Sequence, residues 1–336
     1  MNDHTSEKKL SVVLAAHDKA ADLEKNLPSL LEQEYEPGFE VIVVDESSTD
    51  ETEEVLKQLK ARYPHLYTTY IPASSHYVSR RKLALTIGMK AAHHEWVIIT
   101  EADCHPENGQ WLSAMAATMT DDLDVVCGYT AYEKGTKARY AFLRMLTYWR
   151  QGCRPYRYDG ANIGIRKSWF MEQGGFLHNL KYLRGEYDFL VNEAGRDRIA
   201  VTRTPECRLR QSEPTKKSWK NHQLYHMQVR THLQHALLPR MFFGIHQALL
   251  HLIYWGAIAA IVLSILRQDM VCMVASSAFL LLLVSLHTFL AYRLTKTYGE
   301  HIAPWKLPFL GLYTAWHYLY YRLRYLMSDK YDFRRK

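Results

Sequence analysis

The stretch EVIVVDESSTDET, residues 40–52, places an apolar run directly before a cluster of acids. The run Glu40–Val44 is β-branched and apolar on both faces, which is typical of a parallel strand covered by helices on both sides. The runs Leu10–Ala15 (LSVVLA) and Trp96–Thr100 (WVIIT) have the same character. Amphipathic stretches separate these runs, so residues 1–235 predict an α/β fold with a mostly parallel sheet.

Two of the separating stretches have helical spacing. Thr52–Arg62 is amphipathic, and Ser79–Ala92 places Leu83, Ile87 and Ala91 on one side. We therefore expect two helices here, the second burying Leu83, Ile87 and Ala91 against the sheet.

The composition excludes several classes of protein. With 48% hydrophobic and 23% charged residues among 336, the chain can bury a core and is not a disordered protein. The five cysteines lack CxxC spacing, and the N-terminal MNDHTSEKKL lacks an apolar run. We therefore expect neither a disulfide framework nor a secretory signal.

Charge is distributed unevenly along the chain. Residues 1–60 carry 15 acidic and 6 basic side chains, although the net charge of the whole chain is +7. No helix-turn-helix or zinc-finger pattern accompanies the basic residues downstream, so we expect no nucleic-acid partner. A membrane surface is the partner that the positive charge favours.

Two long runs contain no Asp, Glu, Lys or Arg, namely Met241–Leu266 with 26 residues and Met270–Tyr292 with 23. About 20 apolar residues are enough for a helix to cross a bilayer. Only three residues separate the two runs, which predicts a transmembrane helical hairpin over residues 241–292. A buried helix pair of a soluble protein is the alternative.

Basic residues flank the outer ends of this hairpin. Arg230, Arg240, Arg293 and Lys296 lie there, whereas the connecting turn has only Arg267. By the positive-inside rule both large ends are cytoplasmic, which predicts a protein of the inner (plasma) membrane with its N-terminal domain in the cytoplasm.

Residues 302–336 form a third segment. Apolar and aromatic residues recur at helical spacing between Lys306 and Arg322, and basic residues follow to the end. This pattern predicts an interfacial amphipathic helix with a basic tail. A tilted third membrane span is the alternative.

Acids follow two of the predicted strands where each strand ends. Asp45 begins one cluster, and Glu101 and Asp103 form the other. Ligands of open parallel sheets bind beyond the carboxyl ends of the strands, so we expect both clusters in one site. Neither GxGxxG nor GxxxxGK[ST] occurs, which argues against a nicotinamide or P-loop site. Helix capping and a polar turn are the structural alternatives for the two clusters.

Carboxylates repel phosphate unless a divalent cation or sugar hydroxyls lie between them. Glu101 and Asp103 are two positions apart and can project in similar directions. We expect one to face sugar hydroxyls and the other to face Mg²⁺ or Mn²⁺ on a diphosphate.

Several segments together resemble the family 2 glycosyltransferases, which have a GT-A fold and use nucleotide-diphospho-sugars. In the donor half these segments are SVVLAAHDKA, VIVVDESSTDET, SRRKLALTIGMKAA and VIITEADCHPENGQWL. VVCGYTAYEK, PYRYDGANIGIRKSWFMEQGGF and GEYDFLVN resemble the acceptor half of membrane-linked bacterial members. The resemblance covers residues 10–235 and implies a GT-A domain over 1–235, a Rossmann-like sheet with helices on both faces.

The resemblance also implies roles in donor binding. Asp18 and Asp45 would contact the nucleoside, and Lys82 would lie near the base or the diphosphate. Glu101 would approach the ribose, and Asp103 would bind Mn²⁺ or Mg²⁺. The implied donor is a nucleotide-diphospho-sugar, with UDP or GDP as the nucleotide.

The GEYD segment would supply the catalytic base, with Glu186 in the usual position and Asp188 two residues later. The implied reaction is an inverting transfer, in which one carboxylate removes a proton from the acceptor hydroxyl. The implied acceptor is a lipid-linked or cell-envelope glycan.

The chain departs from the family pattern by having Glu46, Glu101 and Glu186 where Asp is usual. These departures favour the alternative function of a catalytically silent homologue that binds a nucleotide-sugar or acts as a membrane scaffold. The conserved charge at all three positions favours the enzyme. The sequence leaves the oligomeric state open, a homo-oligomer included.

Residues 216–238 follow the implied GT-A motifs. Trp219, Leu224 and Met227 beside several lysines predict a membrane-surface helix that delivers a lipid-linked acceptor. His222 and His226 have the spacing of a zinc-ligand pair, but no third ligand accompanies them, so we expect no metal there.

Overall fold

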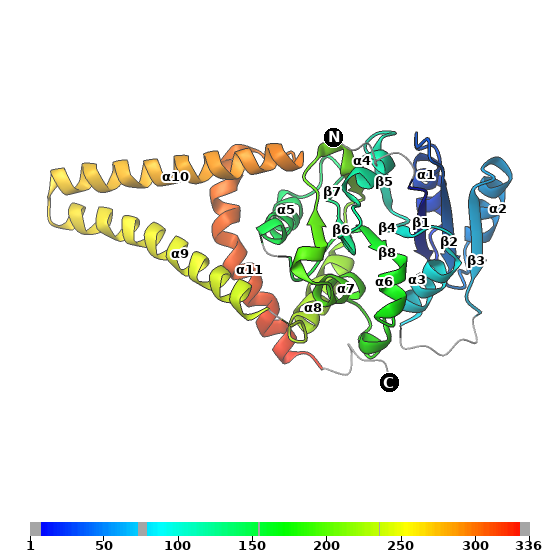
Figure 1. Ribbon diagram of the computed structural model, residues 1–336. Helices are drawn as coiled ribbons and strands as arrows, with labels where there is room; N and C mark the ends of the chain where they lie inside the picture. Colours follow the sequence, from blue (N-terminus) through cyan, green and yellow to red (C-terminus); the bar gives the residue numbers. More distant parts are fainter. Residues whose placement is uncertain (1–7, 73–78, 154, 235, 330–336) are drawn as a thin grey trace.

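A seven-stranded sheet forms the centre of the computed structural model, which describes residues 8–72, 79–153, 155–234 and 236–329 (Figure 1). The strands lie in the order β3 (Leu66–Tyr70), β2 (Phe39–Asp45), β1 (Leu10–Ala16), β4 (Trp96–Glu101), β8 (Asn162–Arg166), β6 (Val125–Cys127) and β9 (Ile199–Val201). All neighbouring pairs are parallel except those that β8 makes with β4 and β6. The predicted α/β fold with a mostly parallel sheet is therefore confirmed.

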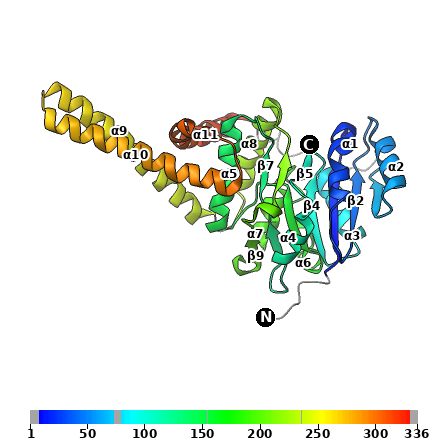
Figure 2. The same ribbon diagram turned by 90° about the horizontal axis from the view of Figure 1, so that it is seen from above.

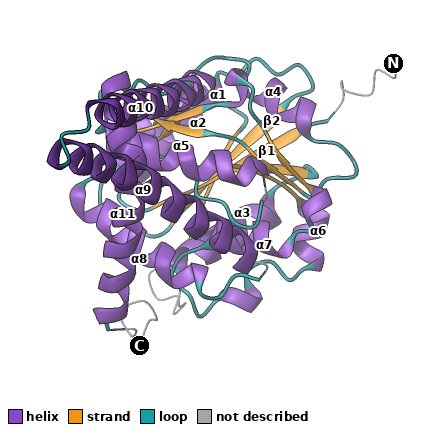
Figure 3. Ribbon diagram, turned by 90° about the vertical axis from the view of Figure 1, so that its left-hand side faces the viewer, coloured by secondary structure: helices purple, strands orange, loops and turns teal. Residues whose placement is uncertain are grey.

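Helices cover both faces of this sheet, as Figure 3 shows. Alternate residues of β1 face opposite layers, because successive side chains of a strand point to opposite sides. One layer contains α1 (Ala20–Leu31), α2 (Thr52–Arg62) and α4 (Trp111–Thr118). The other contains α3 (Arg80–Ala91), α5 (Ala138–Cys153), α6 (Lys167–Glu172) and α7 (Glu186–Glu193).

The helix α3 buries a different side from the one expected. Lys82, Leu85 and Met89 are fully buried, whereas Ala91 is exposed and Leu83 and Ile87 are only partly buried. The cause is Gly88, since a Cβ atom there would lie 2.3 Å from Val13 Cγ1 of β1. The sheet contacts the helix on its glycine side.

A smaller sheet lies beside the main one. It contains β5 (Cys104–Pro106), β10 (Leu209–Gln211) and β7 (Thr130–Tyr132), with β10 in the middle. Three 3₁₀ turns connect the elements of this half, at η1 (Leu177–Asn179), η2 (Arg196–Arg198) and η3 (Pro205–Cys207).

The C-terminal part of the chain forms α8 (Lys216–Arg230), α9 (Leu237–Leu266), α10 (Met270–Tyr298) and α11 (Leu307–Met327), the last preceded by η4 (Pro304–Lys306). Of these helices, α9 and α10 extend away from the body (Figure 2). The helices α9 and α10 form an antiparallel hairpin, and Asp269 caps α10 by accepting from Val271 N at 3.1 Å and Cys272 N at 3.0 Å. Within the described residues, these are the two helices long and apolar enough to cross a membrane, with mean hydropathies of 2.2 and 2.1.

The end of the hairpin is attached to the smaller sheet. Gly299 ends α10 with a φ of 65°, and Arg210 Nη2 of β10 donates to its carbonyl at 3.2 Å. The next residue, Glu300, accepts from the Tyr129 hydroxyl at 2.5 Å. The helix α11 then crosses the base of the hairpin and packs on α8 (Figure 1). The predicted basic tail from residue 330 lies outside the described residues.

The contact of Gly88 with β1 leads to a first prediction. Gly88→Val should lower the free energy of unfolding by about 1–3 kcal/mol, because the added methyl groups would overlap Val13. Denaturant unfolding measures the loss. Gly195→Val is the matched control, since nothing lies within 4 Å of a Cβ atom there, and equal losses in both variants would contradict the packing argument.

Candidate active site

Parallel pairing brings the acids of separate strands to one edge of the sheet. In the register of β1, Ala16 pairs with Asp45 of β2, and Ala15 pairs with Glu101 of β4. The carboxyl ends of β1, β2 and β4 are therefore level, and the loops that follow them open on the same side.

A cavity of about 700 Å³ lies at this edge, and we call it the central cavity. Its lining includes six charged side chains that matter here: Glu46, Arg81, Glu101, Asp103, Glu186 and Asp188. Four of the site residues expected from the sequence, at positions 101, 103, 186 and 188, thus share one cavity although they come from distant parts of the chain.

Arg81 of α3 joins two of these acids. Its guanidinium forms ion pairs with Glu101 at the end of β4 and, through Nε at 2.5 Å, with Glu186 Oε1 at the start of α7. It also donates to the Tyr187 hydroxyl at 3.0 Å. An arginine suits this position because its planar group presents several donors in fixed directions.

Gly185 sets the position of Glu186. It has a φ of 91°, and a Cβ atom there would lie 2.5 Å from Val229 Cγ2 of α8. Burial alone would raise the pKa of Glu186, but Arg81 and Arg184 outweigh burial and hold that pKa below its usual range. Glu186 is therefore an ionised, ion-paired carboxylate.

Asp188 lies in a different environment one half-turn further along α7. It is 8% exposed, and burial raises its pKa to about 7. Among the described residues, its Oδ1 atom has no hydrogen-bond partner. The two carboxylates thus have pKa values shifted in opposite directions, a pattern that distinguishes acid–base roles in enzyme sites.

Asp103 follows β4 and is held from the smaller sheet. Gln211 Nε2, at the end of β10, donates to Asp103 Oδ1 at 3.0 Å. Burial raises the pKa of Asp103, and the neighbouring Glu101 raises it further. Two adjacent carboxylates facing a cavity form an environment that favours a cation.

The donor set fits a divalent ion held partly by a ligand. Over the described ranges, no three His, Cys, Asp or Glu side chains form a complete metal-ligand cluster. Mg²⁺ and similar ions commonly bind through one or two carboxylates plus substrate phosphates and water. Asp103 is the residue that suits this role.

Asp18 and Asp45 lie in the loops beside the central cavity and are not among its described lining residues. Asp18 Oδ1 accepts from Thr49 N at 2.7 Å, a bond that lowers the pKa of Asp18. Asp45 accepts from Ser48 N at 3.1 Å. Asp18 thus joins the β1–α1 and β2–α2 loops, whereas Asp45 holds the start of the β2–α2 loop, and Glu46 lines the cavity in their place.

Lys82 does not lie where the sequence placed it. This residue of α3 is fully buried, and its Nζ donates to the carbonyls of Asn179 and Tyr182, both at 2.7 Å. Burial lowers its pKa to about 8. Lys82 is not among the described lining residues of the central cavity, and the preceding residue, Arg81, lines the cavity instead.

Sequence reasoning missed three further residues of the site. Arg81 is one. Arg80 and Arg81 are neighbours in the segment SRRK, and the sequence does not indicate which of the two side chains faces the cavity. Gln211 comes from a strand of three residues that has no periodic signal. Asp159 is the third, and His222 Nε2 lies 2.7 Å from its Oδ1, so this histidine has a carboxylate partner.

A mostly parallel sheet with one reversed strand and acids at the carboxyl ends of β2 and β4 defines a GT-A-type α/β fold. Residues 11–179 match the model of the family described as Glycosyl transferase family 2. The chain belongs to this family, which confirms the resemblance found in the sequence.

The chain is also similar to individual known proteins. The chain is 27% identical over 120 residues to the uncharacterized glycosyltransferase YibD of Escherichia coli (strain K12), a match that covers 36% of this chain and 33% of YibD. The match thus spans about a third of that curated relative's length. Mannosyltransferase PcManGT from Pyrobaculum calidifontis, solved with GDP-Man and Mn²⁺, has a TM-score of 0.55 at 19% identity and covers 95% of this chain and 89% of its own. S. aureus TarS, solved with UDP-GlcNAc, gives 0.48 at 16% identity, with 66% of each chain covered.

The raised pKa of Asp188 predicts a pH dependence of stability. The folded protein keeps the Asp188 proton up to about pH 7, whereas the unfolded chain loses it near pH 3.8, the usual pKa of an aspartate. The folded state therefore binds more protons between these values, and the free energy of unfolding falls as pH rises from 4 to 7.

Asp188→Asn should remove this part of the pH dependence. Urea unfolding at pH 5 and pH 7.5 measures it, and wild type should lose more stability between the two than the variant does. The exposed Asp197→Asn is the control and should follow wild type. A variant at position 188 that also follows wild type would show that this carboxyl has an ordinary pKa.

Proposed function

We propose that this protein is a membrane-anchored, metal-dependent, inverting glycosyltransferase that moves a sugar from a nucleotide-diphospho-sugar to a lipid-linked or cell-envelope glycan acceptor. The observation that carries the proposal is the central cavity, where acids from β4 and α7 meet around Arg81. Family membership supports the sugar-transfer chemistry.

Donor binding is assigned to the β1, β2 and β4 edge. Lys19, Arg81 and Arg184 line the cavity and supply positive charge for a diphosphate. Glu101 is held by Arg81 at the end of β4, where its carboxylate can accept from sugar hydroxyls. The similar fold of PcManGT, solved with GDP-Man and Mn²⁺, supports a nucleotide-sugar donor, with GDP or UDP as the nucleotide.

Asp103 is the residue proposed to hold the metal, Mn²⁺ or Mg²⁺. When bound, such an ion neutralises charge that develops on the leaving diphosphate. The contribution of the chain is to keep this carboxylate oriented through Gln211 and to place it beside Glu101.

Asp188 is the better candidate for the catalytic base. A base is most effective when its pKa lies near the working pH, and that of Asp188 is raised to about 7. Glu186, the residue first expected in this role, is neutralised by Arg81. In the proposed step the acceptor oxygen attacks the anomeric carbon, its proton passes to Asp188, and the bond to the nucleoside diphosphate breaks with both electrons leaving on the diphosphate.

Membrane anchoring is assigned to the α9–α10 hairpin. At 1.5 Å per residue, its helices of 30 and 29 residues are about 45 Å long and exceed the ~30 Å of a hydrocarbon core. Large apolar side chains are exposed along both helices, among them Leu249, Leu252, Trp255, Leu281, Leu282 and Phe289. Such a surface favours lipid over water, and the basic residues at its base favour a cytoplasmic catalytic domain at the inner (plasma) membrane.

Nucleotide binding tests the metal site. Thermal shift of the full chain with UDP and with GDP should show stabilisation that requires Mn²⁺ or Mg²⁺, and Asp103→Asn should reduce the affinity by about tenfold or more, since a charged ligand is lost. Asp121→Asn, an exposed aspartate on the far loop, is the control and should keep wild-type affinity. Silence of wild type toward every nucleoside diphosphate would contradict the donor assignment.

Two carboxamide variants separate the candidate bases. Asp188→Asn should leave donor binding intact and lower the transfer rate by about 10²–10⁴-fold, the usual contribution of a general base. Glu186→Gln should instead disturb donor binding, because it removes the charge that holds Arg81. Turnover with radiolabelled donor measures the rate, and donor binding without turnover in wild type and variants alike would support the silent homologue.

A further inference from the structure

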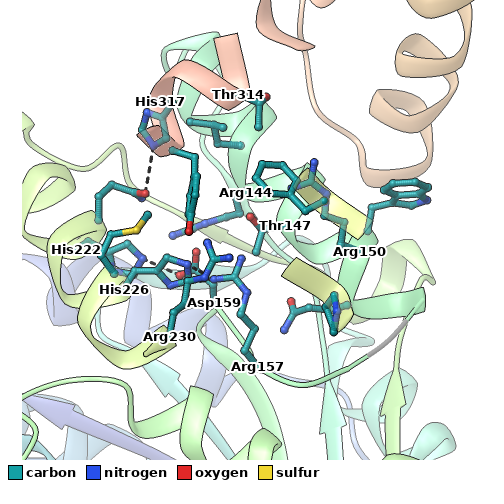
Figure 4. A pocket seen from close by; sticks show the side chains of 18 of the residues that line it. Arg144, Thr147, Arg150, Arg157, Asp159, His222, His226, Arg230, Thr314 and His317 are labelled. Atoms are coloured by element: carbon teal, nitrogen blue, oxygen red, sulfur yellow. Dashed lines mark hydrogen bonds and ion pairs between the residues drawn. The ribbon is translucent and has the colours of Figure 1, made fainter. Parts of the chain in front are cut away.

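A second cavity, of about 480 Å³, lies between the catalytic body and the C-terminal helices, and we call it the lateral cavity. Helices α5, α8, α9 and α11 line it. Figure 4 shows Arg157, Arg230, His226 and Asp159 gathered at one end, with Thr314 and His317 of α11 at the other. No sequence motif pointed to this cavity.

The lateral cavity contains buried positive charge. Arg150, Arg157 and Arg230 all line it, and within the described residues none of the three forms an ion pair with a carboxylate. Burial, together with the charges of Arg157 and Arg230, lowers the pKa of Arg150 to about 9. Burial and Arg157 also lower the pKa of Arg230. Grouping buried like charges is unfavourable unless an anion compensates them.

Polar atoms in the same place lack partners. Arg230 is 8% exposed and Gln151 is 2% exposed, and in the described part of the chain neither Arg230 Nε nor Gln151 Nε2 has a hydrogen-bond acceptor. Arg157 Nη1 lies 2.9 Å from Nδ1 of His226, whose pKa burial lowers well below its usual range, and the Arg157 guanidinium lies 5.9 Å from the centre of the Tyr156 ring. These are donors oriented for an acceptor-rich group, and a phosphate offers several oxygens to arginine forks.

Part of the remaining wall is apolar, beside polar side chains that include Thr314 and His317. Leu143, Met227, Pro239, Phe242 and Phe243 line the cavity. Arg150 and Arg230 lie against aromatic rings, at 4.3 Å from Phe243 and 4.7 Å from Tyr318. Because Pro239–Phe243 belong to the first turns of α9, the apolar wall continues into the proposed membrane hairpin. A sugar would find few hydrogen-bonding groups on this wall, whereas a hydrocarbon chain fits it.

The two cavities share part of their lining. Arg144, Asp159, His222 and His226 line both. Asp188 lies close enough to Arg157 and Asp159 for their charges to act on its pKa. A ligand group held by the arginines of the lateral cavity therefore lies next to the proposed base of the central cavity.

We propose that the lateral cavity binds the phosphate or diphosphate group of a lipid-linked acceptor, with its anionic group on Arg150, Arg157 and Arg230. The hydrocarbon tail runs along α9 and α11 into the bilayer, and the attached hydroxyl-bearing group enters the central cavity. The last part rests on the proposed transferase function, whereas binding of the lipid phosphate does not.

The test uses the full chain in detergent micelles and three probes. Farnesyl phosphate carries both a phosphate and a tail, farnesol lacks the phosphate, and inorganic phosphate lacks the tail. We expect farnesyl phosphate to bind at least tenfold more tightly than either, as measured by isothermal titration calorimetry. Arg157→Gln and Arg230→Gln should each weaken its binding by about 10–100-fold, the range for hydrogen bonds to charged groups.

Matched variants separate binding from folding. Lys216→Gln removes one charge from an exposed position of α8 and should bind like wild type. Arg230→Lys keeps the charge but not the fork, so it should lie between wild type and Arg230→Gln. Thermal unfolding shows whether each variant folds. If Arg230→Gln does not fold, Arg230→Lys takes its place in the comparison with wild type.

Several outcomes would overturn the inference. They are equal binding of farnesol, equal binding of inorganic phosphate, displacement of farnesyl phosphate by phosphatidylglycerol vesicles, and equal affinity of the arginine variants and wild type. Binding of UDP or GDP with Mn²⁺ is measured on the same samples. Loss of nucleotide binding with intact farnesyl phosphate binding would reject the proposed function alone, and the reverse result would reject the lateral cavity alone.

Discussion

The guanidinium of Arg81 lies between two carboxylates from different parts of the fold, Glu101 on the sheet edge and Glu186 on α7. The donor half and the acceptor half of the family 2 pattern therefore meet at one side chain. Removing one partner of a buried ion pair leaves a charge without compensation, which is typically unfavourable by about 3–5 kcal/mol. Arg81 also makes the two acids of α7 differ in pKa. Its charge lowers the pKa of Glu186, whereas the pKa of Asp188 stays raised by burial.

Much of the fold follows from local pattern. The apolar strand runs and the acids that end them predict the parallel sheet and its active edge, since parallel register brings strand ends level. The helix over residues 80–91 shows where this reasoning stops. Its apolar spacing favoured a side with Leu83 and Ile87, but the close approach of Gly88 to Val13 selected the side with Lys82. With the helix in this orientation, Lys82 is buried and Arg81 lines the central cavity.

Local sequence pattern does not predict residues whose contacts depend on long-range packing. Gln211 reaches Asp103 from a three-residue strand, and Asp159 meets His222 of α8 across 63 positions of chain. The lateral cavity is the clearest case, because Arg150 of α5 and Arg157 meet Arg230 of α8, a distant part of the chain, only in the folded protein. Each of these arginines is unremarkable in its own segment. Their common location is a property of the tertiary structure alone.

The hairpin is joined to the catalytic body at both of its ends. At the end of α10 the Gly299 carbonyl accepts from Arg210 of the smaller sheet, and the Glu300 carboxylate accepts from Tyr129, which directly precedes β7. That sheet also carries Gln211, the partner of Asp103. In the proposed membrane-bound state, this linkage fixes the height of Asp103, the proposed metal ligand, above the bilayer surface. The proposed acceptor would have to extend from the bilayer to this height before it could react.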